Sequence, residues 1–180
     1  TPLNKNNDGY LYNSADEIID TAIQIVRKAC IFANKNNLII KSIAFSSVAE
    51  AGIPISKNGN ALLDAIPWYD QRTETIRNNL SNILVEKFIY ENTGLANNHF
   101  YTAYKILWIK RHKTLVYKKI YKWLPISDFI AWKFTGKIST DYSQAMRTML
   151  FDPKKMQWSK KMFFKGIVSL TFVLNGSGTS

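Results

Sequence analysis

A long amphipathic helix followed at once by an apolar strand is the feature that most restricts the fold of this 180-residue chain. Residues 14–17 (Ser-Ala-Asp-Glu) match a capping box, in which a serine and a glutamate satisfy each other's backbone amides at a helix start. Apolar residues then recur at helical spacing as far as Ala33. Residues 38–45 follow, with the composition of a buried strand. This order predicts an α/β domain.

Further elements are predicted on both sides of a hairpin. Asn58-Gly59, between apolar flanks, is the strongest short hairpin signal, because both residues tolerate positive φ. Beyond it the chain is mainly helical, with helices predicted over residues 102–113, 126–134 and 141–149. The predicted helix ends are marked by the caps Thr73 and Ser81 and by the glycines Gly94 and Gly136.

Composition narrows the kinds of molecule that the chain is expected to bind. The 24 Lys and Arg against 13 Asp and Glu give a net charge of +11, which raises nucleic-acid binding as a possibility. These basic residues are scattered in short pairs, so a solvated basic surface is the better interpretation, and no nucleic-acid partner is predicted. No stretch reaches the roughly 20 apolar residues that a membrane span requires, so no membrane partner is predicted either.

Cys30 is the only cysteine, so no disulfide can form within the chain, which fits a cytoplasmic location. It lies on the apolar face of the first predicted helix, and we expect it to be a small core residue. His99 and His112 are not spaced with cysteines or carboxylates as metal ligands would be, so no structural metal is predicted.

Three segments, in order along the chain, resemble one family. Residues 65–73 (Ala-Ile-Pro-Trp-Tyr-Asp-Gln-Arg-Thr) are similar to the Trp-x-Asp-x-Arg-Thr element of the FGGY carbohydrate kinases. Residues 93–95 with 101–108 resemble that family's Thr-Gly segment and the helix carrying Lys-Leu-Leu-Trp. Residues 124–158 carry Leu-Pro, Thr-Gly, Thr-Asp-Tyr-Ser and Arg-Thr-Met-Leu-Phe-Asp. The chain therefore resembles most of the N-terminal domain of an FGGY-family kinase of the xylulose, gluconate or glycerol kinase type.

The resemblance implies an α/β, ribonuclease H-like (actin-like ATPase) domain that lacks its first strands and has a second half rich in helical insertions. It implies ATP and Mg²⁺ as cofactors of the full-length enzyme and phosphoryl transfer to a sugar or polyol hydroxyl, with a ketopentose such as xylulose as the expected substrate. The family's phosphate-binding hairpin is expected before residue 1, and its C-terminal domain, with the catalytic base Asp, after residue 180. Residues 177–179 resemble the junction between the domains.

Residues 1–180 are accordingly interpreted as a partial FGGY N-terminal domain, with no catalytic residue of its own and no turnover by itself. A possible homodimer is expected of the full-length protein. In the chain alone we expect residues 38–45 to expose a strand edge, and exposed edges pair with other chains.

Substrate-binding residues also follow from the resemblance. Glu50 lies where glycerol kinases carry a substrate-binding Glu and xylulose kinases a His. Ala49 replaces the Arg or Met found beside it in those kinases, which leaves the sugar open. Phe100 stands where glycerol kinases place a Tyr facing the substrate, and the absent hydroxyl argues against glycerol. Tyr101 is the candidate to replace that hydroxyl, and the indole of Trp68 is expected to pack on the apolar face of a sugar.

Two further pairs have alternative interpretations. Asp70 and Arg72 can bond sugar hydroxyls or form a structural ion pair with each other, with Asp70 the better candidate for ligand contact. Asp141 and Arg147 are interpreted as structural, the first as a helix N-cap and the second as part of a buried hydrogen-bond network.

Other functions remain open from sequence alone. A gluconate or polyol kinase of the same family is one. A non-catalytic, degenerate kinase half that senses a sugar or binds a partner protein is another. A basic nucleic-acid-binding protein is the third, and it would show a salt-dependent affinity for DNA or RNA.

Overall fold

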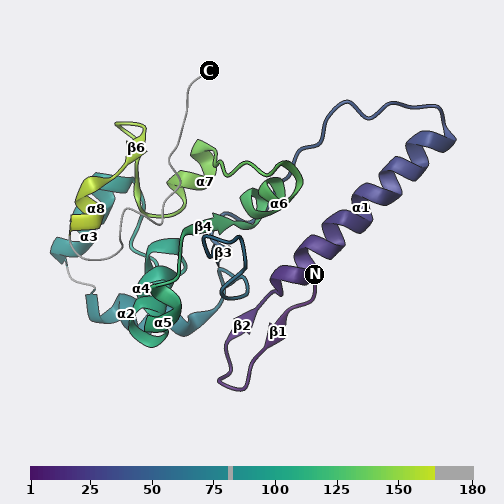
Figure 1. Cartoon of the computed structure of the whole chain (residues 1–180). Coiled ribbons are helices and arrows are strands. Elements are labelled where there is room, and N and C mark those ends of the chain that lie inside the picture. Colours follow the sequence, from purple (N-terminus) through teal and green to yellow (C-terminus); the bar gives the residue numbers. More distant parts are fainter. Residues whose placement is uncertain (81–82, 165–180) are drawn as a thin grey trace.

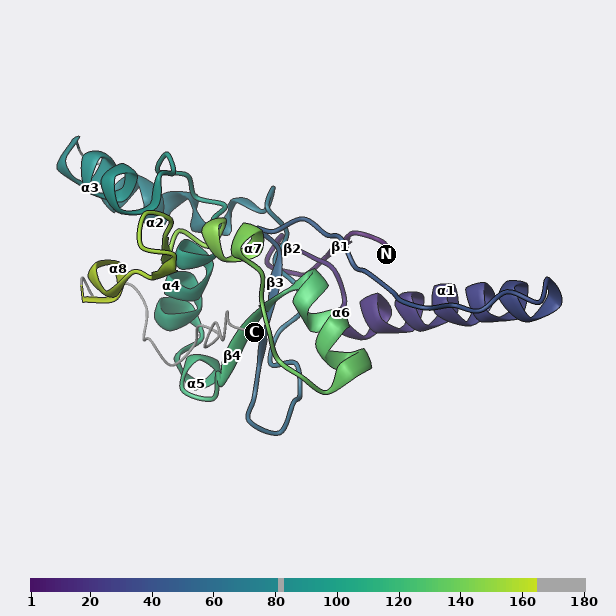
Figure 2. The ribbon, with the colours of Figure 1, turned by 90° about the horizontal axis from the view of Figure 1, so that it is seen from above.

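A computed structural model describes residues 1–80 and 83–164. It consists of a body of short helices and paired strands from which one long helix projects, as both ribbon views show (Figure 1, Figure 2). No helix within these residues is long and apolar enough to cross a membrane.

The projecting helix is α1 (Ala15–Lys35). The Ser14 hydroxyl caps it by accepting a hydrogen bond from the Glu17 amide at 3.3 Å, so the helix and its serine cap are confirmed. The chain reverses at Asn37, which has a φ of 52°, a conformation that asparagine tolerates better than most residues. It then runs back in an extended conformation beside α1 (Figure 1, Figure 2).

The prediction that residues 38–45 form a buried strand is wrong for the described part of the chain, where no strand pairs with them. Leu38, Ile39, Ile40 and Ile43 are exposed. Cys30 is exposed as well, which corrects its expected place in the core. A strand buries its side chains only when pairing places it within a covered sheet, and here the segment faces α1 across an apolar groove of about 700 Å³.

The body is organised around β3 (Gly52–Ile55), which pairs antiparallel with β4 (Lys122–Pro125) in the register Gly52↔Pro125. The predicted Asn58-Gly59 turn is confirmed, with Gly59 at a φ of 80°. After it the chain returns beside β3 through isolated bridges, including Gly52↔Ile66. A Cβ on Gly52 would lie 2.4 Å from the Trp123 indole nitrogen, so glycine alone allows this close approach.

The N-terminal hairpin consists of β1 (Asn4–Lys5) and β2 (Leu11–Tyr12), and the bridge Asn13↔Ala65 joins it to the body. The remaining elements are mostly short helices: η1 (Gln71–Thr73), α2 (Glu74–Leu80), α3 (Ile83–Thr93), α4 (Thr102–His112), α5 (Thr114–Tyr117), α6 (Ile126–Thr135), α7 (Tyr142–Met146), β5 (Phe151–Asp152), β6 (Gln157–Trp158) and α8 (Lys160–Phe164).

Two of the predicted helices, over residues 102–113 and 126–134, are confirmed as α4 and α6. The helix predicted over residues 141–149 ends early, at Met146, and Met149 has a φ of 62°. Gly94 and Gly136 lie at helix ends with positive φ, as predicted. Thr73 ends η1, and its hydroxyl donates to the His99 carbonyl instead of capping a helix. Ser81 and residues 166–174 and 177–179 lie outside the described residues.

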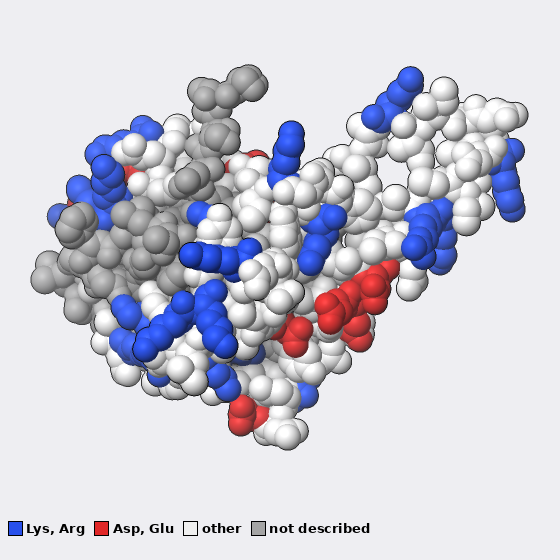
Figure 3. All heavy atoms as spheres, in the orientation of Figure 1, with Lys and Arg blue, Asp and Glu red and all other residues white. Residues whose placement is uncertain are grey.

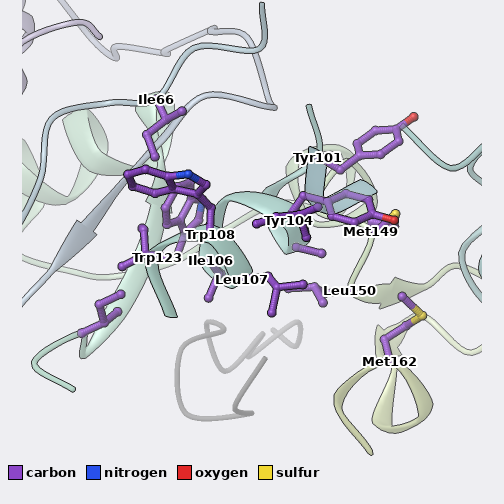
Figure 4. Close-up of a cluster of buried hydrophobic side chains, with 14 of the residues drawn as sticks. Ile66, Tyr101, Tyr104, Ile106, Leu107, Trp108, Trp123, Met149, Leu150 and Met162 are labelled. Carbon is purple, nitrogen blue, oxygen red and sulfur yellow. The ribbon is translucent and has the colours of Figure 1, made fainter. Parts of the chain in front are cut away.

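Helix α4 is the centre of the main core, because its residues from Thr102 to Ile109 are all buried. Side chains from the β3–β4 region and from the segment after α7 surround it (Figure 4). The labelled members of this cluster are Ile66, Tyr101, Tyr104, Ile106, Leu107, Trp108, Trp123, Met149, Leu150 and Met162. This packing fixes the helix that lies beneath the candidate site.

Lys and Arg side chains are spread over the body and along α1 on the face shown in Figure 3. They gather into no single stripe on that face, which agrees with the interpretation of a solvated basic surface.

Candidate functional site

Glu50 and Arg147 form an ion pair at the start of β3. Arg147 Nε donates to Glu50 Oε1 at 2.6 Å, and Arg147 Nη2 contacts the same oxygen. The Glu50 side chain is only 10% exposed, whereas that of Arg147 is 43% exposed. Within the described residues no hydrogen bond goes to Oε2 of Glu50, so one carboxylate oxygen remains an acceptor.

Aromatic rings continue from this pair. The Arg147 guanidinium lies over the Tyr101 ring, 5.4 Å from its centroid. The centroids of Tyr101 and Phe100 are 4.6 Å apart, and those of Phe100 and Trp68 are 6.4 Å apart. Trp68 is 48% exposed, so its indole is open to solvent. Four of the six predicted site residues, Glu50, Trp68, Phe100 and Tyr101, are therefore joined in one series of contacts.

Asp70 and Arg72 form the ion pair that the sequence left open as the alternative. The Asp70 carboxylate accepts from Arg72 Nε at 2.6 Å, from Arg72 Nη2 at 3.0 Å and from the Leu11 amide at 2.6 Å. Arg72 also donates to the Leu11 carbonyl, and its guanidinium lies over the rings of both Tyr10 and Trp108. The pair therefore fastens β2 to η1. Ligand contact by Asp70 stays a prediction.

Electrostatics agree with this structural role. Burial alone would raise the pKa of Asp70, but the hydrogen bonds from the Arg72 side chain and backbone, its charge and the Leu11 amide together hold the pKa below the ordinary value. The carboxylate is thus ionised at neutral pH and already well satisfied.

Lys105 is the buried charge nearest to the site, and sequence reasoning did not single it out. It lies on α4 with no exposed surface. Its ammonium donates to the carbonyl of Glu50 and, at 2.9 Å, to the carbonyl of Ile66. Burial lowers the pKa of Lys105 to about 7, although the charges of Glu50 and Asp70 act in the opposite direction. The available signal was its place in the family-like run Lys-Ile-Leu-Trp at residues 105–108.

The structure also corrects the prediction for the surroundings of Arg147. Its guanidinium is half-exposed and paired with Glu50, so the prediction of a buried hydrogen-bond network is wrong for this residue. The prediction for Asp141 is confirmed, because its carboxylate accepts from the Gln144 amide at 2.9 Å and caps α7. The available signal for Arg147 was its place in the family-like Arg-Thr-Met-Leu segment.

The described residues bring together no group of three or more His, Cys, Asp or Glu side chains that could hold a metal ion. What the arrangement does offer is a carboxylate oxygen, guanidinium donors and the exposed indole of Trp68, which together suit a ligand with hydroxyl groups and apolar C–H faces.

Comparison with known families agrees with this chemistry. The profile of the N-terminal domain of the FGGY family of carbohydrate kinases matches residues 1–169. The chain belongs to the FGGY family of carbohydrate kinases.

Characterised relatives come from several branches of that family. The chain is 34% identical to a xylulose kinase of Staphylococcus xylosus over 70% of this chain and 26% of that protein. It is 32% identical to a glycerol kinase of Sulfolobus acidocaldarius over 86% of this chain and 32% of that protein. The chain thus spans about a quarter to a third of the length of these relatives.

Solved structures confirm the predicted fold class. A gluconate kinase from Lactobacillus acidophilus matches with a TM-score of 0.83 and 25% identity, covering 96% of this chain and 34% of that chain. A Plasmodium falciparum glycerol kinase with ADP matches with a TM-score of 0.84 and 25% identity, covering 96% and 36%. The fold is the ribonuclease H-like, actin-like ATPase type that the sequence predicted.

Proposed function

We propose that this chain is the sugar-binding part of an ATP-dependent carbohydrate kinase, which phosphorylates a hydroxyl of a sugar or polyol. The observation that carries the proposal is the Glu50–Arg147 pair next to the rings of Tyr101, Phe100 and Trp68, in a chain of the FGGY family.

The chemistry of the pair suits sugar hydroxyls. A hydroxyl both donates and accepts, so Glu50 Oε2 can accept a hydrogen bond from one sugar hydroxyl while a guanidinium N–H of Arg147 donates to a neighbouring hydroxyl. Because Glu50 is mostly buried and Arg147 is half-exposed, the ligand reaches the pair from the arginine side. A buried hydroxyl without a partner is costly, so this pairing also selects ligands that carry hydroxyls at the matching positions.

The rings supply the apolar part of the site. The exposed indole of Trp68 offers a flat surface on which the C–H face of a sugar packs. The Phe100 ring contacts this indole in an edge-to-face arrangement. Phe100 has no hydroxyl to donate, so selectivity for hydroxyls rests on the charged pair and on Tyr101, the candidate to replace that hydroxyl. A ketopentose such as xylulose remains our proposed substrate, supported by the similarity to the Staphylococcus xylosus xylulose kinase.

The remaining expectations stand as part of the proposal. ATP and Mg²⁺ are proposed as cofactors of the whole enzyme because the family consists of carbohydrate kinases. A cytoplasmic location, a homodimer of the full-length protein, the division into hairpin, N-terminal and C-terminal parts, and the inactivity of the 180-residue chain alone also stay predictions.

The test is a coupled ADP-release assay on the full-length product of the gene, with xylulose, glycerol, gluconate and L-fuculose as acceptors. We expect turnover with one of them, and a loss of at least about tenfold in kcat/KM for that sugar in Glu50→Gln. Glu17→Gln, which changes an exposed glutamate on α1, is the matched control. Sugar binding without turnover would instead favour the sugar-sensing alternative.

A further inference from the structure

Lys105 holds two separate segments of backbone with one ammonium group. It lies on the inner face of α4, has no exposed surface, and donates to the carbonyls of Glu50 and Ile66. Lysine is almost never fully buried without partners, because its charge is poorly solvated in the interior. The two hydrogen bonds from its ammonium to carbonyl oxygens therefore indicate that a charged donor has a role at this position.

The two carbonyls belong to the segments that carry the proposed sugar contacts. Glu50 lies two positions before the start of β3, and Ile66 precedes Pro67 and Trp68. The segments meet at the bridge Gly52↔Ile66, where the Ile66 amide donates to the Gly52 carbonyl at 3.4 Å. Beyond that bridge they separate, one toward Glu50 and the other toward Trp68. At this point of separation the Lys105 ammonium donates to the carbonyls of Glu50 and Ile66.

The same helix supports the arginine of the pair. Tyr101 is the N-cap residue of α4, with an extended backbone, and lies four positions before Lys105. The Tyr101 ring lies against the Arg147 guanidinium, whereas the Lys105 ammonium lies against the backbone of Glu50. The first turn of α4 and its N-cap residue thus contact both members of the ion pair.

We propose that Lys105 is a positioning residue for sugar binding: by holding the carbonyls of Glu50 and Ile66 on one ammonium, it fixes the Glu50 carboxylate relative to the Trp68 indole. It does not touch the sugar. The inference rests on the proposed function, because Glu50 and Trp68 supply the contacts that Lys105 arranges.

Core packing alone does not explain a lysine at this position. A methionine of similar length would fill the same volume without a charge to desolvate. Burial lowers the pKa of Lys105 to about 7, and the charged groups that face it act in opposite directions, Glu50 and Asp70 favouring the ammonium and Arg72 opposing it. A desolvated amine is thus placed where its N–H donors meet two carbonyls.

The test compares Lys105→Met with two matched variants of the 180-residue chain. Ile109→Ala removes a fully buried side chain from the same helix and controls for lost stability. Lys119→Met removes an exposed lysine and controls for charge. Sugar dissociation constants are measured by titration at a temperature where each variant is folded. We expect Lys105→Met to weaken binding at least tenfold, and each control to change it less than about twofold.

A second measurement, on the unmodified chain, covers the case in which Lys105→Met does not fold. Carbon-detected spectra resolve carbonyl resonances even before a proline, which applies to Ile66. We expect saturation with sugar to shift the carbonyl resonances of both Glu50 and Ile66.

Three outcomes would overturn the inference. In the first, Lys105→Met binds sugar as the unmodified chain does. In the second, Ile109→Ala at equal stability loses as much affinity. In the third, the Ile66 carbonyl does not respond to the sugar. If the unmodified chain binds none of the sugars, the proposed function fails together with this inference, whereas the first three outcomes leave the proposed function intact.

Discussion

The Arg147 guanidinium is bound to the Glu50 carboxylate, with Nε 2.6 Å from Oε1, although 97 positions separate the two residues in sequence. Glu50 stands just before β3, and Arg147 directly follows α7. The pair therefore joins the first and last parts of the body at the point where the proposed sugar contacts begin.

The first prediction concerns this pair. Arg147→Met leaves the mostly buried Glu50 carboxylate without its cation, and we expect a loss of about 1–3 kcal/mol of unfolding free energy. Sugar affinity should fall at least tenfold. Urea denaturation and sugar titration measure the two effects, with Arg27→Met on the exposed side of α1 as the control. Unchanged sugar affinity in Arg147→Met would remove the pair from the site.

The second prediction concerns Asp70, which is 2% exposed and paired with Arg72. Asp70→Asn leaves the largely buried guanidinium without a counter-charge, so we expect a loss of about 3 kcal/mol of unfolding free energy and unchanged sugar affinity in the molecules that remain folded. Asp8→Asn, at an exposed carboxylate, should change neither quantity. Lost affinity at unchanged stability would instead place Asp70 in ligand contact.

The pH dependence of Asp70 has a definite sign. Its pKa is lower in the folded state than in the unfolded chain, so below about pH 4 the unfolded chain binds more protons. The contribution of Asp70 to stability is therefore complete above that pH and is lost as the pH falls through the folded-state pKa. As the pH falls below about 4, Asp70→Asn should therefore lose less unfolding free energy than the unmodified chain.

The third prediction concerns Asp128, a buried carboxyl near the start of α6 whose Oδ2 has no hydrogen-bond partner in the described structure. Burial raises its pKa to about 6, the nearby charge of Asp141 acts in the same direction, and the hydroxyls of Thr140 and Ser127 oppose the rise. The folded state therefore binds more protons than the unfolded chain between about pH 4 and 6, so this residue makes stability fall as the pH rises through that range.

Asp128→Asn should remove this dependence and raise the unfolding free energy at pH 7 by up to about 3 kcal/mol, at about 1.4 kcal/mol per pKa unit. Thermal denaturation at pH 4 and pH 7 measures the difference. Asp152→Asn, at a partly exposed carboxylate, serves as the comparison. A lower stability of Asp128→Asn at pH 7 contradicts the prediction.

The fourth prediction concerns the apolar surface formed by α1 and residues 38–45. Phe32 is 63% exposed and Ile39 is 77% exposed, and contiguous exposed apolar surface promotes association. We expect the average mass of the chain, measured by light scattering, to rise with concentration. The double variant Phe32→Ser, Ile39→Ser should remain monomeric with its unfolding free energy changed by less than about 0.5 kcal/mol per site. Asn34→Ser is the control, and a chain that is monomeric at every concentration refutes the prediction.

The sequence predicted those elements whose signals are local. The Ser14 cap, the Asn58-Gly59 turn and the glycine ends of α3 and α6 depend on a few adjacent residues, and the structure contains them. The segment 38–45 failed because its burial depends on a neighbouring strand, and the described part of the chain supplies none. Apolar composition indicates what a segment can bury, not whether a partner is present to cover it.

The site was predictable in its individual residues but not in its pairings. Glu50 and Trp68 stand in segments whose resemblance to the family marks them, whereas the partner of Glu50 is Arg147, from the far end of the domain. Lys105 was missed for a related reason. A lysine within a helix is usually solvated, and only the folded arrangement of β3 and Ile66 shows that its donors meet two carbonyls.

The most direct test of the account is a nitrogen–proton correlation spectrum of the chain titrated with xylulose, glycerol, gluconate and L-fuculose. At a hundredfold excess over its dissociation constant a bound sugar also stabilises the fold by about 2.7 kcal/mol, so thermal denaturation supplies a second reading. The account predicts that one sugar shifts both the Trp68 indole resonance and the Glu50 amide, and that Glu50→Gln abolishes the shifts. Shifts confined to other residues, or none with any sugar, would contradict it.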